Sequence, residues 1–254
     1  RLTRGYVRMD WSAVAQIVAL SLLVAGTSTL IGTVLGVPLG ALIAIKRFRG
    51  RNFVRTLAFT FYGFPPVLAG LLVYLVLSRS GPLGFLGWIF TPIGMILAQA
   101  VLIVPIVTGV TISAVQVVEK RLHETALTLG ADDRQWRSTA VHEARLGVLT
   151  AVMVGFGRAI SEVGAVLIVG GNIAGQTRVL TTAIVLETSE AHYLEASILG
   201  AILFVLAFAV FAVLQHLQQE GVVWPLPSAS PASRSRSGTR RSFRGFNSTS
   251  RAEK

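Results

Sequence analysis

The chain has 254 residues, of which 52% are hydrophobic and only 14% are charged. A soluble domain carries about 25% charged residues, so this composition excludes an ordinary soluble domain and indicates an all-α, polytopic membrane protein. The net charge of +11 lies in short loops and a tail, as orientation signals do, which argues against nucleic-acid binding, and the absence of cysteine excludes disulfides and thiol-based metal sites.

The first predicted span is an uncharged run of 35 residues, Trp11 to Ile45. About 20 helical residues cross a ~30 Å hydrocarbon core, so we expect one long, tilted helix. Gly32, Gly36 and Gly40 recur on one face of this helix. They either allow a second helix to approach closely or reflect the general frequency of glycine in membrane helices.

The second predicted span, Thr56 to Leu77, follows a loop with five basic residues and no acid, Lys46 to Arg55. The positive-inside rule places this loop in the cytoplasm. Pro65 and Pro66 lie in the middle of the span, where they should bend or break the helix. Such a break is either structural or lines a cavity.

Three further spans are predicted, at Trp88 to Val118, Leu146 to Val169 and Ala196 to Leu214. A short apolar piece at residues 179–186 re-enters the membrane or packs within an external loop. We therefore expect about five spans, with six as the alternative count.

The basic residues predict the orientation of these spans. Five spans place the N-terminus outside and the C-terminus in the cytoplasm, with 17 basic residues on the inner side and five on the outer side. Residues 1–224 should form the membrane domain. Residues 225–254 are rich in serine, arginine and proline and should form a disordered cytoplasmic tail.

A polar segment, residues 119–145, separates the third span from the fourth. It carries five basic and five acidic residues and has helical spacing on both sides of Gly130, a residue type suited to a helix stop. We expect a cytoplasmic helical hairpin, which docks a partner or is an ordinary amphipathic hairpin.

Catalytic motifs are absent from the sequence. There is no GxxxxGK[ST] phosphate loop and no GxSxG serine motif. His123-Glu124 and His142-Glu143 begin like zinc-protease motifs, but neither has the second histidine at the required spacing. We expect neither an enzyme nor a metal site.

Two charges, Arg158 and Glu162, lie within the fourth predicted span. Each costs about 2.5–3.5 kcal/mol at mid-bilayer, so they should pair, four residues apart, and face protein or a water-filled path. Either Arg158 contacts an anion in that path with Glu162 as its orienting partner, or the pair is a buried brace between helices. The other candidates for the path or its gate are Ser161, Gly164, Gly170, Gly171 and Asn172, the last as a donor near the outer mouth.

The polar segment resembles a known signature. Permeases of type I ABC importers carry Glu-Ala-Ala, three residues, Gly, nine residues and Ile-x-Leu-Pro in a cytoplasmic loop. Glu124, Ala126 and Gly130 match this pattern, Thr125 replaces the first alanine, and residues 140–143 depart from it. The resemblance implies that the two helices beside the glycine form a coupling hairpin that docks on the ATPase subunit.

The fourth span resembles a narrower group. Its sequence GFGRAISEVGAVLIVGGNI, residues 155–173, is similar to the corresponding segment of permeases for tungstate, molybdate and sulfate, and is most similar to the tungstate branch. The resemblance covers roughly residues 12–219. It implies a multi-pass permease of a bacterial or archaeal cell (inner) membrane that imports tungstate or a similar tetrahedral oxyanion.

The same resemblance implies the partners. They are a second copy of the chain, two copies of an ATP-binding subunit that holds ATP and Mg, an external oxyanion-binding protein and membrane lipid, with no cofactor in this chain. The alternatives are a molybdate or sulfate importer, an ion-coupled transporter or channel without an ATPase, and a membrane scaffold that does not transport.

Overall fold

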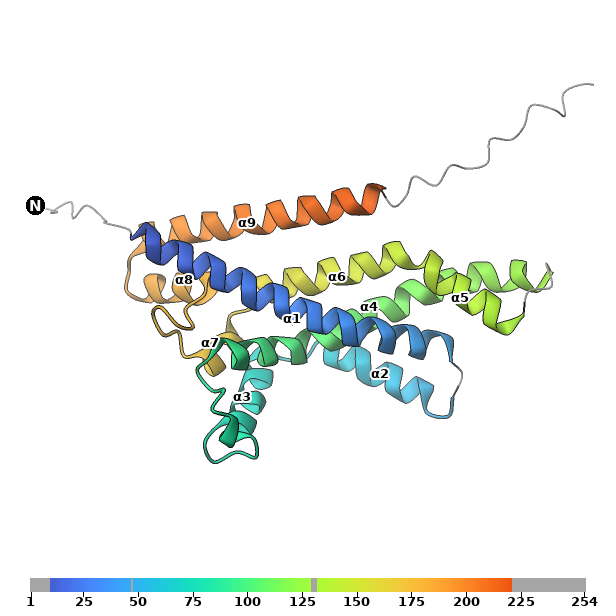
Figure 1. The fold of residues 1–254 in the computed structure, drawn as a ribbon, viewed down its shortest axis with the longest axis horizontal. Helices are drawn as coiled ribbons and strands as arrows, with labels where there is room; N and C mark the ends of the chain where they lie inside the picture. The colour runs from blue at the N-terminus through green and yellow to red at the C-terminus, as the bar shows by residue number, and fades with distance from the viewer. Residues whose placement is uncertain (1–9, 47, 129–131, 221–254) are drawn as a thin grey trace, which may run out of the picture. The chain divides into compact units, whose positions relative to one another are not determined.

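The computed structural model describes residues 10–46, 48–128 and 132–220. The described residues form α-helices and one short 3-10 helix, and no strand is found among them, so the predicted all-α class is confirmed. In chain order the elements are α1 (Trp11–Ile45), α2 (Arg51–Tyr62), α3 (Pro66–Leu77), η1 (Gly84–Leu86), α4 (Pro92–Thr128), α5 (Asp133–Glu143), α6 (Arg145–Ile160), α7 (Gly164–Gly170), α8 (Leu180–Ser189) and α9 (Tyr193–Glu220) (Figure 1). The tail predicted at residues 225–254 lies outside the described residues.

Three described helices are long and apolar enough to cross a membrane alone: α1, α4 over Pro92–Glu119, and α9 over Tyr193–Gln218. Two bent helix pairs pass the same test when each is taken as one span, α2 with α3 and α6 with α7, which brings the total to the five predicted. The apolar piece at residues 179–186 lies in α8, whose 10 residues rise only about 15 Å. That length is too short for a sixth span.

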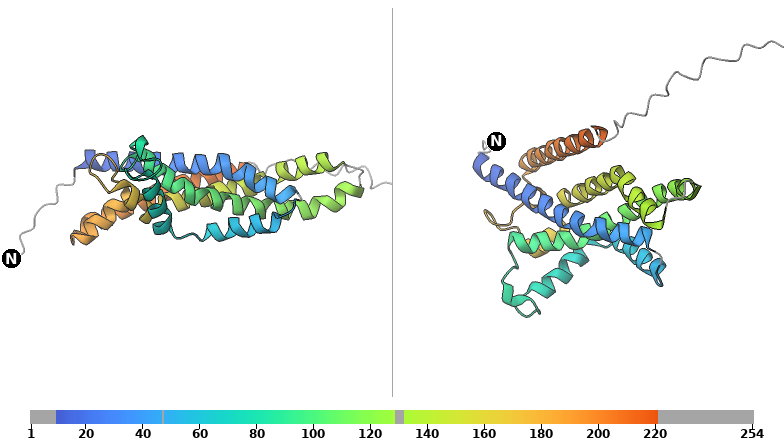
Figure 2. Two further views of the ribbon diagram at one scale, coloured as in Figure 1. Left: turned by 90° about the horizontal axis from the view of Figure 1, so that it is seen from below. Right: turned by 45° about the vertical axis from the view of Figure 1, so that its right-hand side comes forward.

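The two bent spans break in different ways. The axes of α2 and α3 meet at 101°, and the left view of Figure 2 shows α3 turned sharply away from the direction of α2. Gly63 ends α2, and Pro66 supplies the first residue of α3, a position where the missing N–H costs no helical hydrogen bond. Pro38 and Pro105, by contrast, lie inside unbroken helices.

The fourth span is not the continuous helix that its apolar run predicts, because it bends by 55° between α6 and α7. The hydroxyl of Ser161 donates to the carbonyls of Gly157 and Arg158 at 2.8 and 3.2 Å. The side chain of Glu162 accepts the N–H of Ala165 at 3.1 Å. These local side-chain bonds compete with the helical ladder and end the helix without a proline.

The glycine face of α1 packs directly on α4. A Cβ placed on Gly36 would lie 2.9 Å from the carbonyl oxygen of Val104, and one on Gly40 would lie 2.7 Å from that of Thr108. Both glycines are buried. Of the two interpretations given above, the structure supports close helix approach.

A central core joins α1, α4 and α6, whereas α9 is attached more loosely. Ala25, Ile103, Val107 and Phe156 belong to one buried cluster at this core. Only 6% of the most apolar window of α9 is buried. The exposed aromatic and aliphatic side chains of α9 suit contact with lipid or with another protein.

Candidate functional site

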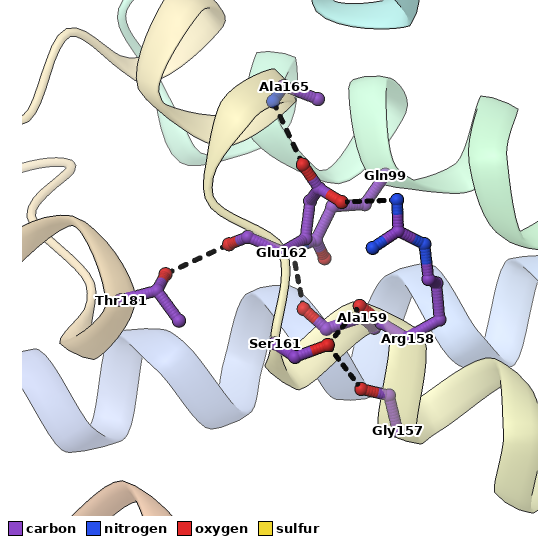
Figure 3. Close-up of polar contacts among 8 residues, drawn as sticks. All are labelled: Gln99, Gly157, Arg158, Ala159, Ser161, Glu162, Ala165 and Thr181. Atoms are coloured by element: carbon purple, nitrogen blue, oxygen red, sulfur yellow. Dashed lines mark hydrogen bonds and ion pairs between the residues drawn. The ribbon is translucent and has the colours of Figure 1, made fainter. Parts of the chain in front are cut away.

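The candidate site is the break between α6 and α7, where the two intramembrane charges meet. The Nη2 atom of Arg158 lies 3.0 Å from the Oε2 atom of Glu162 (Figure 3). The side chain of Glu162 is 3% exposed, whereas that of Arg158 is 34% exposed. The side chain of Glu162 is therefore enclosed by protein, whereas that of Arg158 lies partly at the surface of the chain.

The pair also complements the two helix ends. Arg158 lies in the last turn of α6, where the helix dipole favours a cation. The carboxylate of Glu162 lies just before α7, where it accepts the N–H of Ala165 through Oε1. The second oxygen, Oε2, meets Arg158 as an ion pair without hydrogen-bond geometry. One carboxylate thus links the end of α6 to the start of α7.

Polar side chains from other helices hold this break in place. The buried Gln99 of α4 donates its amide to the carbonyl of Ala159 at 3.0 Å and accepts the hydroxyl of Ser28 at 2.7 Å. Thr181 of α8 donates to the carbonyl of Glu162 at 2.9 Å. Two carbonyls at the break, those of Ala159 and Glu162, therefore accept hydrogen bonds from side chains of α4 and α8.

These supporting residues were not predicted from the sequence. Gln99 is an isolated polar residue within a long apolar run, and Ser28 lies in the Thr-Ser-Thr stretch of another, which is the signal that could have singled them out. Thr181 gives no such signal, because its partner is a backbone carbonyl exposed only by the break. Gln99, Glu162 and Thr181, together with Ser21, contribute to the lining of a small cavity beside the break.

Ser161 and Gly164 lie beside the ion pair but make different contacts. Ser161 is exposed, and its hydroxyl is committed as a donor to the last turn of α6. Gly164 faces α3, because a Cβ there would lie 2.9 Å from the Cγ2 atom of Val67. A Cβ on Gly70 of α3 would in turn lie 2.6 Å from the Cα atom of Ala165. The breaks of the two bent spans therefore meet at this α3–α7 contact.

Gly170, Gly171 and Asn172 lie at the far end of α7. A Cβ on Gly170 would lie 2.8 Å from the sulfur of Met95, so the helix end packs tightly against α4. Gly171 and Asn172 both have left-handed backbones, with φ of 71° and 52°, which glycine and asparagine tolerate best. Asn172 is half-buried, and its Oδ1 atom has no hydrogen-bond partner in the described part of the chain. The predicted path residues thus fall into two groups, one at each end of α7.

The predicted coupling residues lie at the end of α4. Glu124, Thr125 and Ala126 belong to its helical backbone, and Gly130 lies outside the described residues. The helix α5 follows, so two helices flank the glycine as the hairpin prediction requires. The first of them is not a separate helix, because α4 runs for 37 residues from the apolar span into the polar segment.

The second helix of the hairpin is anchored to the membrane helices. Trp136 and Ala140 of α5 are 5% and 0% exposed. Just after α5, Ala144 belongs to a buried cluster with Ala44 of α1 and Val115 of α4. A force on the hairpin therefore has direct apolar contacts through which to act on α1 and α4.

The known proteins to which this chain is similar are membrane components of transport systems. The model of the family described as "Binding-protein-dependent transport system inner membrane component" matches residues 36–223. A probable anion ABC transporter permease protein of Haloferax volcanii is 42% identical over 210 residues, which cover 81% of this chain and 90% of the relative. The tungstate uptake system permease protein TupB of Peptoclostridium acidaminophilum is 40% identical over 207 residues, which cover 82% and 91%.

A solved structure shares the fold. A chain from inward-facing conformations of the MetNI methionine ABC transporter superposes with a TM-score of 0.67 at 17% sequence identity. The match covers 84% of this chain and 97% of that chain. At this identity the likeness concerns the arrangement of the helices alone.

Proposed function

This chain belongs to the family of inner membrane components of binding-protein-dependent transport systems, and from that premise we propose that it carries tungstate or a similar tetrahedral oxyanion into the cell. The observation that carries the substrate class is the 40% identity to a tungstate permease over 82% of this chain. Molybdate and sulfate are the alternative substrates, because these anions share the shape and charge of tungstate. As a family member the chain is a permease subunit, which translocates its substrate.

Arg158 is the residue that we propose to meet the anion. Its side chain is 34% exposed, and its guanidinium has N–H groups beyond the one that faces Glu162. A planar fork of donors suits the oxygens of a tetrahedral anion. Glu162 is 3% exposed and holds Arg158 in place, so we assign it a positioning role. In this proposal the pair has both of the predicted roles. The carboxylate of Glu162 braces the break, and the guanidinium of Arg158 faces the path.

The energy for transport would come from a separate subunit. We propose that two copies of an ATP-binding protein, which hold ATP and Mg, dock on the hairpins of two copies of this chain. Closure of the ATPase dimer would then pull on α4, whose unbroken helix extends from the hairpin into the membrane span. The anion path between the two copies would turn from inward-facing to outward-facing, and hydrolysis would reset it.

We also propose which parts of the chain lie outside the cell and which lie in the cytoplasm. The distribution of basic residues supports an external N-terminus and cytoplasmic hairpins. An oxyanion-binding protein would deliver its cargo on the outer side, near the loop that follows α7. An ion-coupled transporter or channel without an ATPase is less well supported, because it gives the hairpin no role.

Reconstitution tests the proposal. The chain, its ATPase and its binding protein are placed in liposomes, and uptake of tungstate is measured with ATP, with molybdate and sulfate as competitors. We expect uptake that needs all three proteins and ATP. Uptake by the chain alone would contradict the importer mechanism, and preference for another substrate would overturn the choice of tungstate.

Two variants separate the roles within that assay. Arg158→Lys keeps a cation for Glu162 but loses the fork, so uptake should fall roughly tenfold while the thermal stability changes little. Gly130→Glu should leave the protein inserted but uncouple ATP hydrolysis from uptake. Unchanged transport in the first variant would leave Arg158 as a brace only, and unchanged coupling in the second would refute docking at the hairpin.

A further inference from the structure

A second cation, Arg178, lies in the loop between α7 and α8, and this loop has a fixed backbone. The carbonyl of Ile173 accepts the N–H groups of Gln176, Thr177 and Arg178 at 3.1, 3.0 and 3.1 Å. Thr177 is fully buried. Its hydroxyl donates to the carbonyl of Gly170 at 2.6 Å and accepts the N–H of Ile173 at 2.9 Å. These bonds bring Arg178 back beside the start of the loop, where Asn172 lies.

Both of these loop side chains carry buried polar atoms without partners. The Nε atom of Arg178 and the Oδ1 atom of Asn172 are buried and lack a hydrogen bond within the described ranges. No described carboxylate forms an ion pair with Arg178. Buried polar groups in folded proteins are nearly always paired, and an uncompensated cation is more costly still. The unpartnered N–H of Arg178 therefore lacks an acceptor in the described chain, which an anion would supply, while the Oδ1 atom of Asn172 shows that this amide is not committed to a protein donor there.

We propose that Arg178 and Asn172 form a receiving site for the oxyanion at the outer mouth of the path, ahead of Arg158. This inference rests on the proposed function. The guanidinium supplies charge and a fork of N–H donors that match two oxygens of a tetrahedral anion. The amide of Asn172 turns its NH2 toward the same anion by rotation of its terminal torsion.

The loop also connects this site to the α6–α7 break. Thr181 lies three residues beyond Arg178, and its hydroxyl donates to the carbonyl of Glu162 at 2.9 Å. The segment that carries Arg178 therefore contacts the segment that fixes Arg158. An anion released by the binding protein would meet Arg178 first and pass inward to Arg158, so that its charge is compensated at both stages.

The burial of Arg178 favours an anion in transit over a carboxylate on the surface of the binding protein. Arg178 is half-buried, and its Nε atom is shielded from solvent. Arg79, the other described arginine on the proposed outer side, is exposed as a docking residue would be. A small anion reaches a shielded guanidinium more readily than a protein surface does.

The test compares Arg178→Gln with the matched control Arg79→Gln in the reconstituted importer. Initial tungstate uptake, ATP hydrolysis and the affinity for loaded binding protein are measured for each. We expect Arg178→Gln to lower uptake per ATP hydrolysed on the order of tenfold and to leave the affinity for the binding protein unchanged. Arg79→Gln should behave like the wild type in all three measurements.

A second variant, Asn172→Asp, tests the same site independently in case Arg178→Gln fails to fold. Asn172→Asp keeps the shape and the left-handed backbone, but its negative charge should repel a dianion and lower uptake. Normal uptake per ATP in both variants would overturn the receiving site, as would a loss of binding-protein affinity that accounts for the whole defect. Absence of any oxyanion uptake by the wild type would instead overturn the proposed function, so the two failures are distinguishable.

Discussion

The two bent spans reach their bends by opposite means. Between α2 and α3 the chain bends by 101° at Gly63–Pro66, where proline and glycine alter the backbone itself. Between α6 and α7 it bends by 55° with no proline, and side chains hold the break: an ion pair, a carboxylate cap and hydroxyl groups. The first bend is produced by the backbone preferences of glycine and proline. The second depends on side-chain contacts, which a ligand or a neighbouring helix can alter.

The largest effect is expected from Arg158→Ala, which removes the partner of an enclosed carboxylate. Glu162 is 3% exposed, so its unpaired charge cannot be solvated, and we expect a loss of about 3–5 kcal/mol in stability. The measurement is the unfolding of the purified chain in detergent. Glu162→Gln should cost less, about 1–3 kcal/mol, because Arg158 still reaches solvent. Equal losses in the two variants would contradict this asymmetry.

The double variant Arg158→Ala/Glu162→Gln sharpens the same point. With both charges removed, no uncompensated carboxylate remains, so stability should recover part of the loss seen in Arg158→Ala. A double variant no more stable than Arg158→Ala would show that the ion pair does not hold the α6–α7 break.

A smaller effect is expected where the two bends touch. Gly70→Ala places a Cβ 2.6 Å from the Cα atom of Ala165, a backbone atom that cannot move aside alone. We expect a loss of about 1–3 kcal/mol as α3 and α7 separate. Gly26→Ala in α1 is the matched control, because no atom lies within 4 Å of its added Cβ. Equal stability of the two variants would mean that the α3–α7 contact is loose.

The α2–α3 bend could be predicted from the sequence. Which prolines break a helix and which do not could not be predicted. Two adjacent prolines, Pro65 and Pro66, predicted a break, and the structure has one. Pro38 and Pro105 are single prolines within apolar runs, and both lie inside unbroken helices. Both belong to the pair α1 and α4, which pack tightly over the glycine face. Tertiary packing therefore decides whether a single proline ends a helix.

The α6–α7 bend was not visible, although its ion pair was. The spacing of Arg158 and Glu162 predicted pairing on one continuous helix, and the pair forms, but across a helix break. The break needs Gln99 and Thr181, whose bonds to the carbonyls of Ala159 and Glu162 join residues 60 and 19 positions apart. No local pattern in the sequence contains such long-range bonds, so the charges could be predicted and their scaffold could not.

The smallest effect is expected from Pro66→Ala at the covalent bend. Pro66 is the first residue of α3, where its N–H would have no helical partner, so the substitution removes no native hydrogen bond. We expect a loss of about 0.4–1 kcal/mol, since alanine gives the unfolded chain more freedom. The bend should persist because Gly63 and Pro65 remain. Spin labels on α2 and α3 would report the angle between them: an unchanged distance supports a bend fixed by the backbone, and straightening would show that Pro66 alone maintains it. In that case both bends of the permease would depend on replaceable side chains, and the difference between them would be one of degree.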